Sequence, residues 1–239
     1  MPNYKLVNAD QLDSDLESVA YAIRAKTGRQ ERLVFPEDFV SAVGSISGGE
    51  ETIDSLIDGT ALRVVSNAPM VRSYAFHESY LEEAILPLAT YIGNYAFRYC
   101  ENLASVDLRS TITIESYAFY GCISLTDLKL PNASSIGTAA FRGCTVLEKV
   151  DISSAVNIPG NSFAACEALS TVILRSETMC TMSNASAFSD TPIANGTGYI
   201  YVPKNLLSAY VSASNLSTYA TQLRAIEDYP EICGSGEIM

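Results

Sequence analysis

The stretch SIGTAAFRGCTVLEKVDI (135–152) decides the fold of this chain, because TIESYAFYGCISLTDLKL (113–130) repeats its apolar pattern 22 residues earlier. In both stretches a Phe follows an Ala, a Cys lies three residues after the Phe, and a Leu lies six after it. The Phe recurs at intervals of 21, 22, 22, 22 and 25 residues, at Phe76, Phe97, Phe119, Phe141, Phe163 and Phe188. A period in this range is typical of stacked structural repeats.

The aligned repeats share the consensus I-x-x-x-A-F-x-x-C-x-x-L-x-x-V-x-L. Its last positions alternate between apolar and other residues, as a short strand does. The sequence therefore predicts a repeat solenoid of short parallel β-strands joined by irregular or short helical turns, with a period of about 22 residues. Equivalent residues then stack about 4.8 Å apart. A single turn of the chain cannot bury enough apolar surface to fold alone, so neighbouring turns stabilise each other.

The segments IGNYAFRYCENLASVDL (92–108) and IGTAAFRGCTVLEKVDI (136–152) resemble the BspA-type leucine-rich repeat, which occurs in bacterial surface and secreted proteins. The resemblance covers roughly residues 64–202. It implies a leucine-rich-repeat solenoid and a binding function, but it names no ligand, because repeat scaffolds carry many partners.

Both ends of the chain depart from the repeat. The spacing of Leu12, Leu16, Val19 and Ile23 predicts one apolar helix face near the start. YIYV (199–202) reads as a last strand, followed by a short helix after Pro203 and another over 217–226. We therefore divide the chain into a helical module (1–47), a linker and lead-in (48–63), the solenoid (64–198), and an α/β cap with a tail (199–239).

The terminal segments carry a second resemblance. ADQLDSDLESVAYAIRAKTG (9–28) and LVFPEDFVSAV (33–43) are similar to a short helical segment of tail and baseplate proteins from phages and prophages of Gram-positive bacteria. Residues 198–231 resemble a tail segment of repeat proteins in the same setting, which usually have Trp where this chain has Leu216. This resemblance implies that the N-terminal module docks to other phage structural proteins.

The repeated cysteines could be metal ligands, nucleophiles, disulfide partners or small core residues. One Cys per turn forms a straight column, whereas a metal site needs converging ligands, and side by side the Cβ atoms lie too far apart for good disulfide geometry. We predict that Cys100, Cys122, Cys144 and Cys166 are reduced, buried fillers of the core. No role is predicted for Cys180 or Cys233, and the single histidine, His77, is predicted to be exposed.

Two outward surfaces are candidates for binding. The strand positions Glu83, Ser105, Asp127, Lys149 and Thr171 form one predicted outward row, and Ile85, Asp107, Lys129, Asp151 and Ile173 form the other. Their charges either form a solvated ladder of cross-strand pairs or a polar ligand face. The second surface has aromatic residues at Tyr74, Tyr95, Tyr99, Tyr117 and Tyr120. These rings either cover the edge of the core or form a contact strip for a protein or glycan.

Composition excludes several function classes. The net charge is −12, which argues against nucleic acid or an anionic membrane as the partner. The sequence has no apolar run long enough to span a membrane and no basic-then-apolar leader, so we expect no membrane insertion and synthesis in a bacterial cytoplasm. It also lacks recognisable catalytic, phosphate-binding or metal-binding motifs, so we expect no enzyme activity and no cofactor or metal.

The leading hypothesis is a non-enzymatic phage or prophage structural or host-binding protein, located in the tail or baseplate of the virion. The alternative is a BspA-like adhesin or interaction protein at the bacterial cell surface. A homo-oligomer is compatible with either hypothesis, and the sequence does not decide it.

Overall fold

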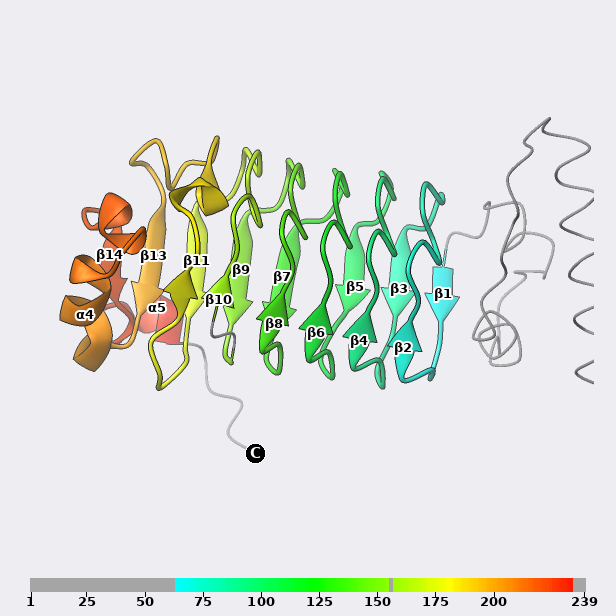
Figure 1. The fold of residues 1–239 in the computed structure, drawn as a ribbon, viewed down its shortest axis with the longest axis horizontal. Coiled ribbons are helices and arrows are strands. Elements are labelled where there is room, and N and C mark those ends of the chain that lie inside the picture. Colours follow the sequence, from blue (N-terminus) through cyan, green and yellow to red (C-terminus); the bar gives the residue numbers. More distant parts are fainter. Residues whose placement is uncertain (1–62, 155–156, 234–239) are drawn as a thin grey trace, which may run out of the picture.

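The computed structural model describes residues 63–154 and 157–233, which form one elongated solenoid (Figure 1). The predicted N-terminal helical module and nearly all of the predicted linker lie outside these residues. Each turn of the chain contributes one strand to each of two long sides, and every strand pair is parallel. The predicted fold class is therefore confirmed.

One side of the solenoid carries the longer strands. They form two sheets, the first with β1 (Arg63–Val65), β3 (Glu83–Ile85) and β5 (Ser105–Asp107). The second sheet has the order β14-β13-β11-β9-β7, from β7 (Asp127–Leu130), β9 (Lys149–Ile152), β11 (Thr171–Leu174), β13 (Tyr199–Val202) and β14 (Leu223–Ala225). The predicted V-x-L positions provide the inward side chains of these strands.

The opposite side consists of two-residue strands. Four of them form one sheet: β2 (Met70–Val71), β4 (Tyr91–Ile92), β6 (Thr113–Ile114) and β8 (Ser135–Ile136). A second sheet pairs β10 (Asn157–Ile158) with β12 (Thr181–Met182). The repeated Ile is the inward, buried residue of β4, β6, β8 and β10, as its place in the consensus requires.

The repeated phenylalanines form the centre of the core. Their rings stack from Phe76 to Phe188, with successive centroids 5.0 to 5.7 Å apart and planes within 18° of parallel. From Phe97 onward each ring is completely buried. Since each ring packs on the rings of both neighbouring turns, the core is continuous along the solenoid and no turn is independent of the next.

The ladder of long strands is interrupted between β5 and β7. Among the described residues these two strands form no pair, and Figure 1 shows them more widely spaced than β3 and β5. Pro131, directly after β7, has no N–H group to donate to the preceding turn. At the equivalent place in the next two turns, Ser153 and Arg175 donate their N–H to the preceding turn, at 3.2 and 2.9 Å. A hollow of about 410 Å³ lies at the interruption.

The C-terminal end is closed by a cap. It contains the short helices η2 (Lys204–Leu206), α4 (Leu207–Ser212) and η3 (Leu216–Tyr219), while η1 (Ala185–Phe188) belongs to the last turn of the solenoid. Figure 1 shows α4 at the end opposite β1. The predicted strand over 199–202 is confirmed, but the helix predicted over 217–226 is wrong. The helix η3 ends at Tyr219, and 223–225 forms β14, whose backbone pairs with β13.

The last elements, η4 (Ile226–Asp228) and α5 (Pro230–Cys233), cover part of the long-strand side. Ile173, Tyr201, Ile226 and Ile232 form a small apolar cluster there, separate from the main core. The prediction that Ile173 is exposed is therefore wrong. Its side chain does point away from the main core, but the C-terminal segment buries it completely.

Candidate interaction surfaces

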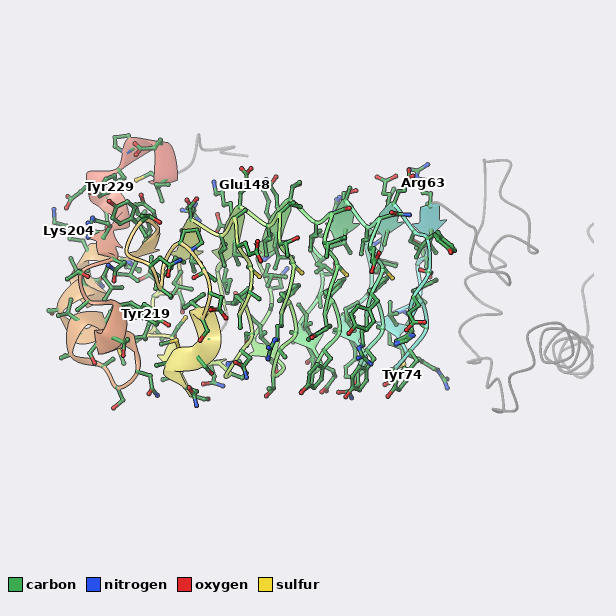
Figure 2. All side chains as sticks on the ribbon, turned by 90° about the horizontal axis from the view of Figure 1, so that it is seen from above. Arg63, Tyr74, Glu148, Lys204, Tyr219 and Tyr229 are labelled. Carbon is green, nitrogen blue, oxygen red and sulfur yellow. The ribbon has the colours of Figure 1, made fainter. Side chains whose placement is uncertain are left out.

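The tyrosine face consists of Tyr74, Tyr95, Tyr99, Tyr117 and Tyr120. Tyr74 and Tyr95 stack with centroids 4.9 Å apart, and Tyr95 and Tyr117 stack at 5.1 Å with planes only 5° from parallel. Tyr74 is 57% exposed, and the other four are half-buried. In Figure 2, Tyr74 lies on the opposite side of the solenoid from Arg63 and Glu148. The predicted strip over the first turns is therefore present as a continuous aromatic surface.

The backbone at these tyrosines is left-handed. Tyr74, Tyr95 and Tyr117 have φ angles of 64°, 59° and 60°, and the same position in the next two turns is also left-handed, at Ala139 and Asn161. A non-glycine residue in this region is destabilised by roughly 1–2 kcal/mol. The conformation recurs in five successive turns, but it does not require a tyrosine, since Ala and Asn occupy the same position further along.

Arg98 lies among three of these rings. Its guanidinium carbon is 4.6 Å from the centroid of Tyr99, 5.4 Å from that of Tyr95 and 5.5 Å from that of Tyr120. Nη2 donates a long hydrogen bond of 3.4 Å to the Tyr99 hydroxyl, which raises the pKa of Arg98. Arg98 is not among the residues that the sequence predicts for this surface. The available signal was its position, one residue after Phe97, between the columns that contain Tyr95 and Tyr99.

Two neighbours determine where Tyr99 lies. Gly121 lies one turn after Tyr99 and has a φ of +72°. A Cβ atom at this position would come within 2.6 Å of the Tyr99 ring, so the glycine leaves room for the ring. The centroid of the His77 ring lies 6.5 Å from that of Tyr99. The His77 side chain is 25% exposed, and its Nδ1 is 3.7 Å from the Glu78 carboxylate. His77 is therefore less exposed than predicted, because tyrosine rings pack against it.

The strand face consists of Asp107, Asp127, Lys129, Lys149 and Asp151. Register confirms that Asp127 lies beside Lys149 and that Lys129 lies beside Asp151. No such pairing joins Asp107 to Lys129, because the ladder is interrupted between their strands. The predicted outward row of Asp107, Lys129 and Asp151 is therefore interrupted after Asp107.

Two acidic residues of the strand face have arginine partners instead. The Asp107 carboxylate accepts hydrogen bonds from Arg109 at 2.8 to 3.2 Å, and although burial opposes the shift, these bonds lower its pKa. Arg175 contacts both carboxylate oxygens of Asp151 at 2.9 to 3.0 Å and also donates to the main-chain oxygen of Ile232 at 2.8 Å. Arg175 therefore links the strand face to the C-terminal segment that covers its far end.

The four repeated cysteines are buried and unpaired, as predicted. Each thiol also donates to the carbonyl oxygen of a phenylalanine in the preceding turn, at 2.9 to 3.3 Å, a contact that the sequence did not reveal. Burial raises the pKa of Cys100 to about 11 and raises those of Cys122 and Cys144 well above the ordinary value. Cys100, Cys122 and Cys144 therefore keep their protons at neutral pH. The protection of all four thiols from thiol reagents stays a prediction.

The remaining cysteines differ from the column. Cys180 is buried, and its N–H donates to the hydroxyl of Tyr210, a fully buried residue of α4, at 2.7 Å. Cys233 is exposed. In the parts of the chain that the structure describes, no group of three or more His, Cys, Asp or Glu side chains is arranged to hold a metal ion. No helix in those parts is long and apolar enough to cross a membrane.

Comparison with known families agrees with this architecture. The family described as "BspA type Leucine rich repeat region (6 copies)" matches residues 69–195, more than half of the chain. No curated protein matches the chain.

Solved structures show the same kind of fold. The pneumococcal vaccine antigen PcpA aligns over 69% of this chain and 40% of its own, with 21% identity and a TM-score of 0.55. A leucine-rich-repeat protein from Bacteroides ovatus aligns over 61% of this chain and 36% of its own, with 24% identity and a TM-score of 0.47. The chain therefore matches well under half the length of either protein.

Proposed function

The chain belongs to the BspA-type leucine-rich-repeat family, and we propose that it is a non-enzymatic recognition protein whose tyrosine face binds a protein or glycan. The family and the fold are suited to protein interaction or adhesion. The observation that carries the proposal is the stack of Tyr74, Tyr95 and Tyr117 at left-handed backbone positions.

The choice of tyrosine at these positions supports binding. Glycine would be the least strained residue there, and Ala139 and Asn161 serve the same position in later turns. Tyrosines nevertheless occupy this strained position in three consecutive turns, where the edges of their phenol rings lie on the surface. Tyrosine combines apolar area with a hydrogen-bonding hydroxyl, which suits it to interfaces. A surface that only needed to cover the core would not need the hydroxyls.

The setting that we propose is a phage or prophage particle. The N-terminal segment resembles tail and baseplate proteins, and in this proposal it docks the chain to other structural proteins of the virion while the solenoid contacts the host. Mass spectrometry of purified particles tests this part, and absence of the protein from them contradicts it.

A bacterial cell-surface adhesin is the second candidate. The observation that favours it is the family itself, together with the likeness in fold to PcpA, which is described as a pneumococcal vaccine antigen. Fractionation of the bacterium that encodes the chain separates the two settings. Protein on intact cells without induced particles supports the adhesin, and protein only in particles supports the virion component.

Binding by the tyrosine face is tested with two matched double variants of the full chain. Tyr95→Ala with Tyr117→Ala places at both sites the residue that Ala139 already provides in a later turn. Asp127→Ala with Lys149→Ala changes the strand face and leaves the net charge unchanged. We expect the tyrosine variant to lose at least about tenfold in binding to host cells, because two large contact residues are removed, while the strand variant binds normally. The reverse result overturns the assignment.

A further inference from the structure

Most arginines in the described part of the chain have acceptors for their N–H groups. Arg109 pairs with Asp107, and Arg175 pairs with Asp151. Arg224 also lies over a tyrosine ring, that of Tyr199 at 4.4 Å, but its Nη1 donates to the main-chain oxygens of Thr221 and Leu223 at 2.9 and 2.8 Å. Contact with an aromatic ring is therefore compatible with hydrogen bonding to main-chain oxygens in this fold.

Arg98 is different. It forms no ion pair with any residue that the structure describes, and its one hydrogen bond is the 3.4 Å contact with the Tyr99 hydroxyl. Its Nε is buried without a hydrogen-bond partner. A buried donor without an acceptor destabilises the folded state, and such groups are uncommon in native proteins. The outer nitrogen Nη1 has no acceptor in the described residues either.

The rings hold this guanidinium in place. With three tyrosine rings within 5.5 Å, Arg98 loses its side-chain freedom before any ligand binds. An arginine fork that is already ordered binds a planar oxyanion at a lower entropic cost than a mobile one. Arg98 therefore has the features of a preorganised anion-binding group: a fixed position, a full positive charge and N–H groups that have no acceptor among the described residues.

We propose that the ligand of the tyrosine face is a glycan that carries an oxyanion, either a carboxylate or a phosphate, and that the Arg98 guanidinium binds this group. The inference rests on the proposed function of the tyrosine face and specifies the chemistry of its ligand. Arg142 lies in the same column two turns further along, is exposed, and has no ion pair with a described residue. At about 4.8 Å per turn it lies roughly 10 Å from Arg98 and provides a second cation for a repeating acidic chain.

The chemistry of this surface favours a glycan over a peptide. The turn backbone is already used between neighbouring turns, for example from the N–H of Phe97 to the oxygen of Ala118 at 2.7 Å, and from that of Tyr99 to the oxygen of Tyr120 at 2.7 Å. A peptide cannot add here as an extra strand. What the surface offers instead is a row of phenol hydroxyls, which suit the hydroxyl groups of a sugar chain. The ring faces are covered by stacking, so a neutral sugar has little area on which to stack.

Two nearby carboxylates oppose an anion, those of Glu78 and Glu101, which line one hollow together with Tyr99. The Glu78 carboxylate lies beside His77 at 3.7 Å, and the chain as a whole has a net charge of −12. Long-range attraction therefore contributes nothing, and recognition depends on the short-range fork of Arg98. Glu78→Gln should accordingly strengthen anion binding.

The test is calorimetric titration of the full chain with four polymers: polygalacturonate, its neutral methyl ester, poly(glycerol phosphate), and polyglutamate as an acidic peptide. We expect binding of polygalacturonate, of poly(glycerol phosphate), or of both, and none of the methyl ester. The stronger of the two acidic polymers identifies the oxyanion. Arg98→Gln should weaken that binding at least about tenfold, the effect of one charge-assisted contact.

The matched control is Arg224→Gln, which removes the same charge and an equivalent ring contact but leaves the tyrosine face intact. It should bind like the unaltered chain. Arg98→Lys retains the charge without the fork and should bind at an intermediate level, so it tests the proposal even if Arg98→Gln fails to fold. Circular dichroism and thermal melting establish folding for each variant.

Three results overturn the inference: equal binding of the methyl ester, no binding of either polygalacturonate or poly(glycerol phosphate), or equal loss in the Arg98 and Arg224 variants. Polyglutamate binding as tightly as the glycans would instead identify an acidic peptide and also overturn it. None of these results affects the proposed function, which is tested by cell binding of the tyrosine double variant. If the tyrosine variant loses cell binding but the chain shows no preference for acidic glycans, the proposed recognition function stands and only the inference of an anionic ligand is rejected.

Discussion

The phenylalanine column and the tyrosine column run side by side along the same turns, but they differ in how many turns keep the same residue type. Both stack with ring centroids about 5 Å apart. The phenylalanines continue from Phe76 to Phe188 without exception, whereas the tyrosines stop after Tyr117 and are followed by Ala139 and Asn161. The inward position meets the same packing demand in every turn, but the outward position meets only solvent or a partner.

This difference separates positions whose residue type every turn shares from positions whose residue type only some turns share. A residue type that every turn needs reports on the fold. A residue type that only neighbouring turns share reports on something local, and in this chain the local feature is an aromatic surface with an arginine among its rings. The following predictions test that separation.

The largest expected effect is in the inward column. Phe119→Ala removes a fully buried ring from the stack and should lower the free energy of unfolding by about 3–5 kcal/mol, because it leaves a cavity between two turns. Tyr117→Ala, two residues earlier, should lower it by only about 1 kcal/mol, since that ring is half-buried and its stacking is partly solvated. Urea denaturation measures both. Equal losses would show that the tyrosine column is as structural as the phenylalanine column.

The next effect concerns pH. Burial raises the pKa of Cys100 to about 11 in the folded chain, from a reference value of 9.0. A group whose pKa is raised by folding contributes its full stability below the unfolded pKa and loses it as the pH rises through the folded pKa. Cys100 alone should therefore account for a loss of about 2–3 kcal/mol between pH 9 and pH 11, and Cys122 and Cys144 act in the same direction.

Urea denaturation at several pH values from 8 to 11 measures this loss. In Cys100→Ala the baseline stability is lower, but the decline above pH 9 should be shallower because one titrating thiol is absent. The buried phenol of Tyr210, whose pKa is raised mainly by desolvation, adds to the decline in both proteins. An identical pH dependence in the two proteins would contradict the assignment to Cys100.

The smallest effect compares two glycines in one outward column. Gly121 and Gly143 have φ angles of +72° and +76°, so alanine at either position should destabilise the fold by about 1 kcal/mol. Only at Gly121 would the new Cβ meet the Tyr99 ring, at 2.6 Å; at Gly143 the nearest atoms are 3.8 Å away. We expect Gly121→Ala to lose roughly 1 kcal/mol more, from the displaced ring.

Chemical denaturation of the two alanine variants checks this difference. Near-ultraviolet circular dichroism should change only in Gly121→Ala, since only that variant moves tyrosine rings. If both variants lose the same stability and retain the same spectrum, the tyrosine face is not ordered by Gly121.

The sequence predicted the core well because the core is periodic. A spacing of about 22 residues identifies which side chains are equivalent, and equivalent side chains in a solenoid must point the same way. That reasoning placed Cys144 inside and Tyr95 outside. It could not predict the interruption between β5 and β7, because strand pairing depends on how two turns pack in space, nor the burial of Ile173, which depends on a segment more than fifty residues later.

The candidate site was predictable only in part. The tyrosine positions followed from the same periodicity as the core. Arg98 did not, because its importance lies in what surrounds it: it contacts three rings from two turns and forms no ion pair with a described residue. A sequence pattern does not reveal whether a charged side chain has an ion-pair partner, because ion pairs depend on distances in the folded structure.

By itself the sequence determined a BspA-type solenoid, its register, and the inward and outward columns, because repetition forces each turn to repeat the hydrogen bonds and burial of its neighbours. Only the tertiary structure decided how outward residues are used. Arg175 and the C-terminal segment close one end of the strand face, while Arg98 keeps unused N–H groups on the tyrosine face. Outward side chains meet neighbours from several turns and from the cap, and those contacts depend on three-dimensional packing that no repeat unit contains.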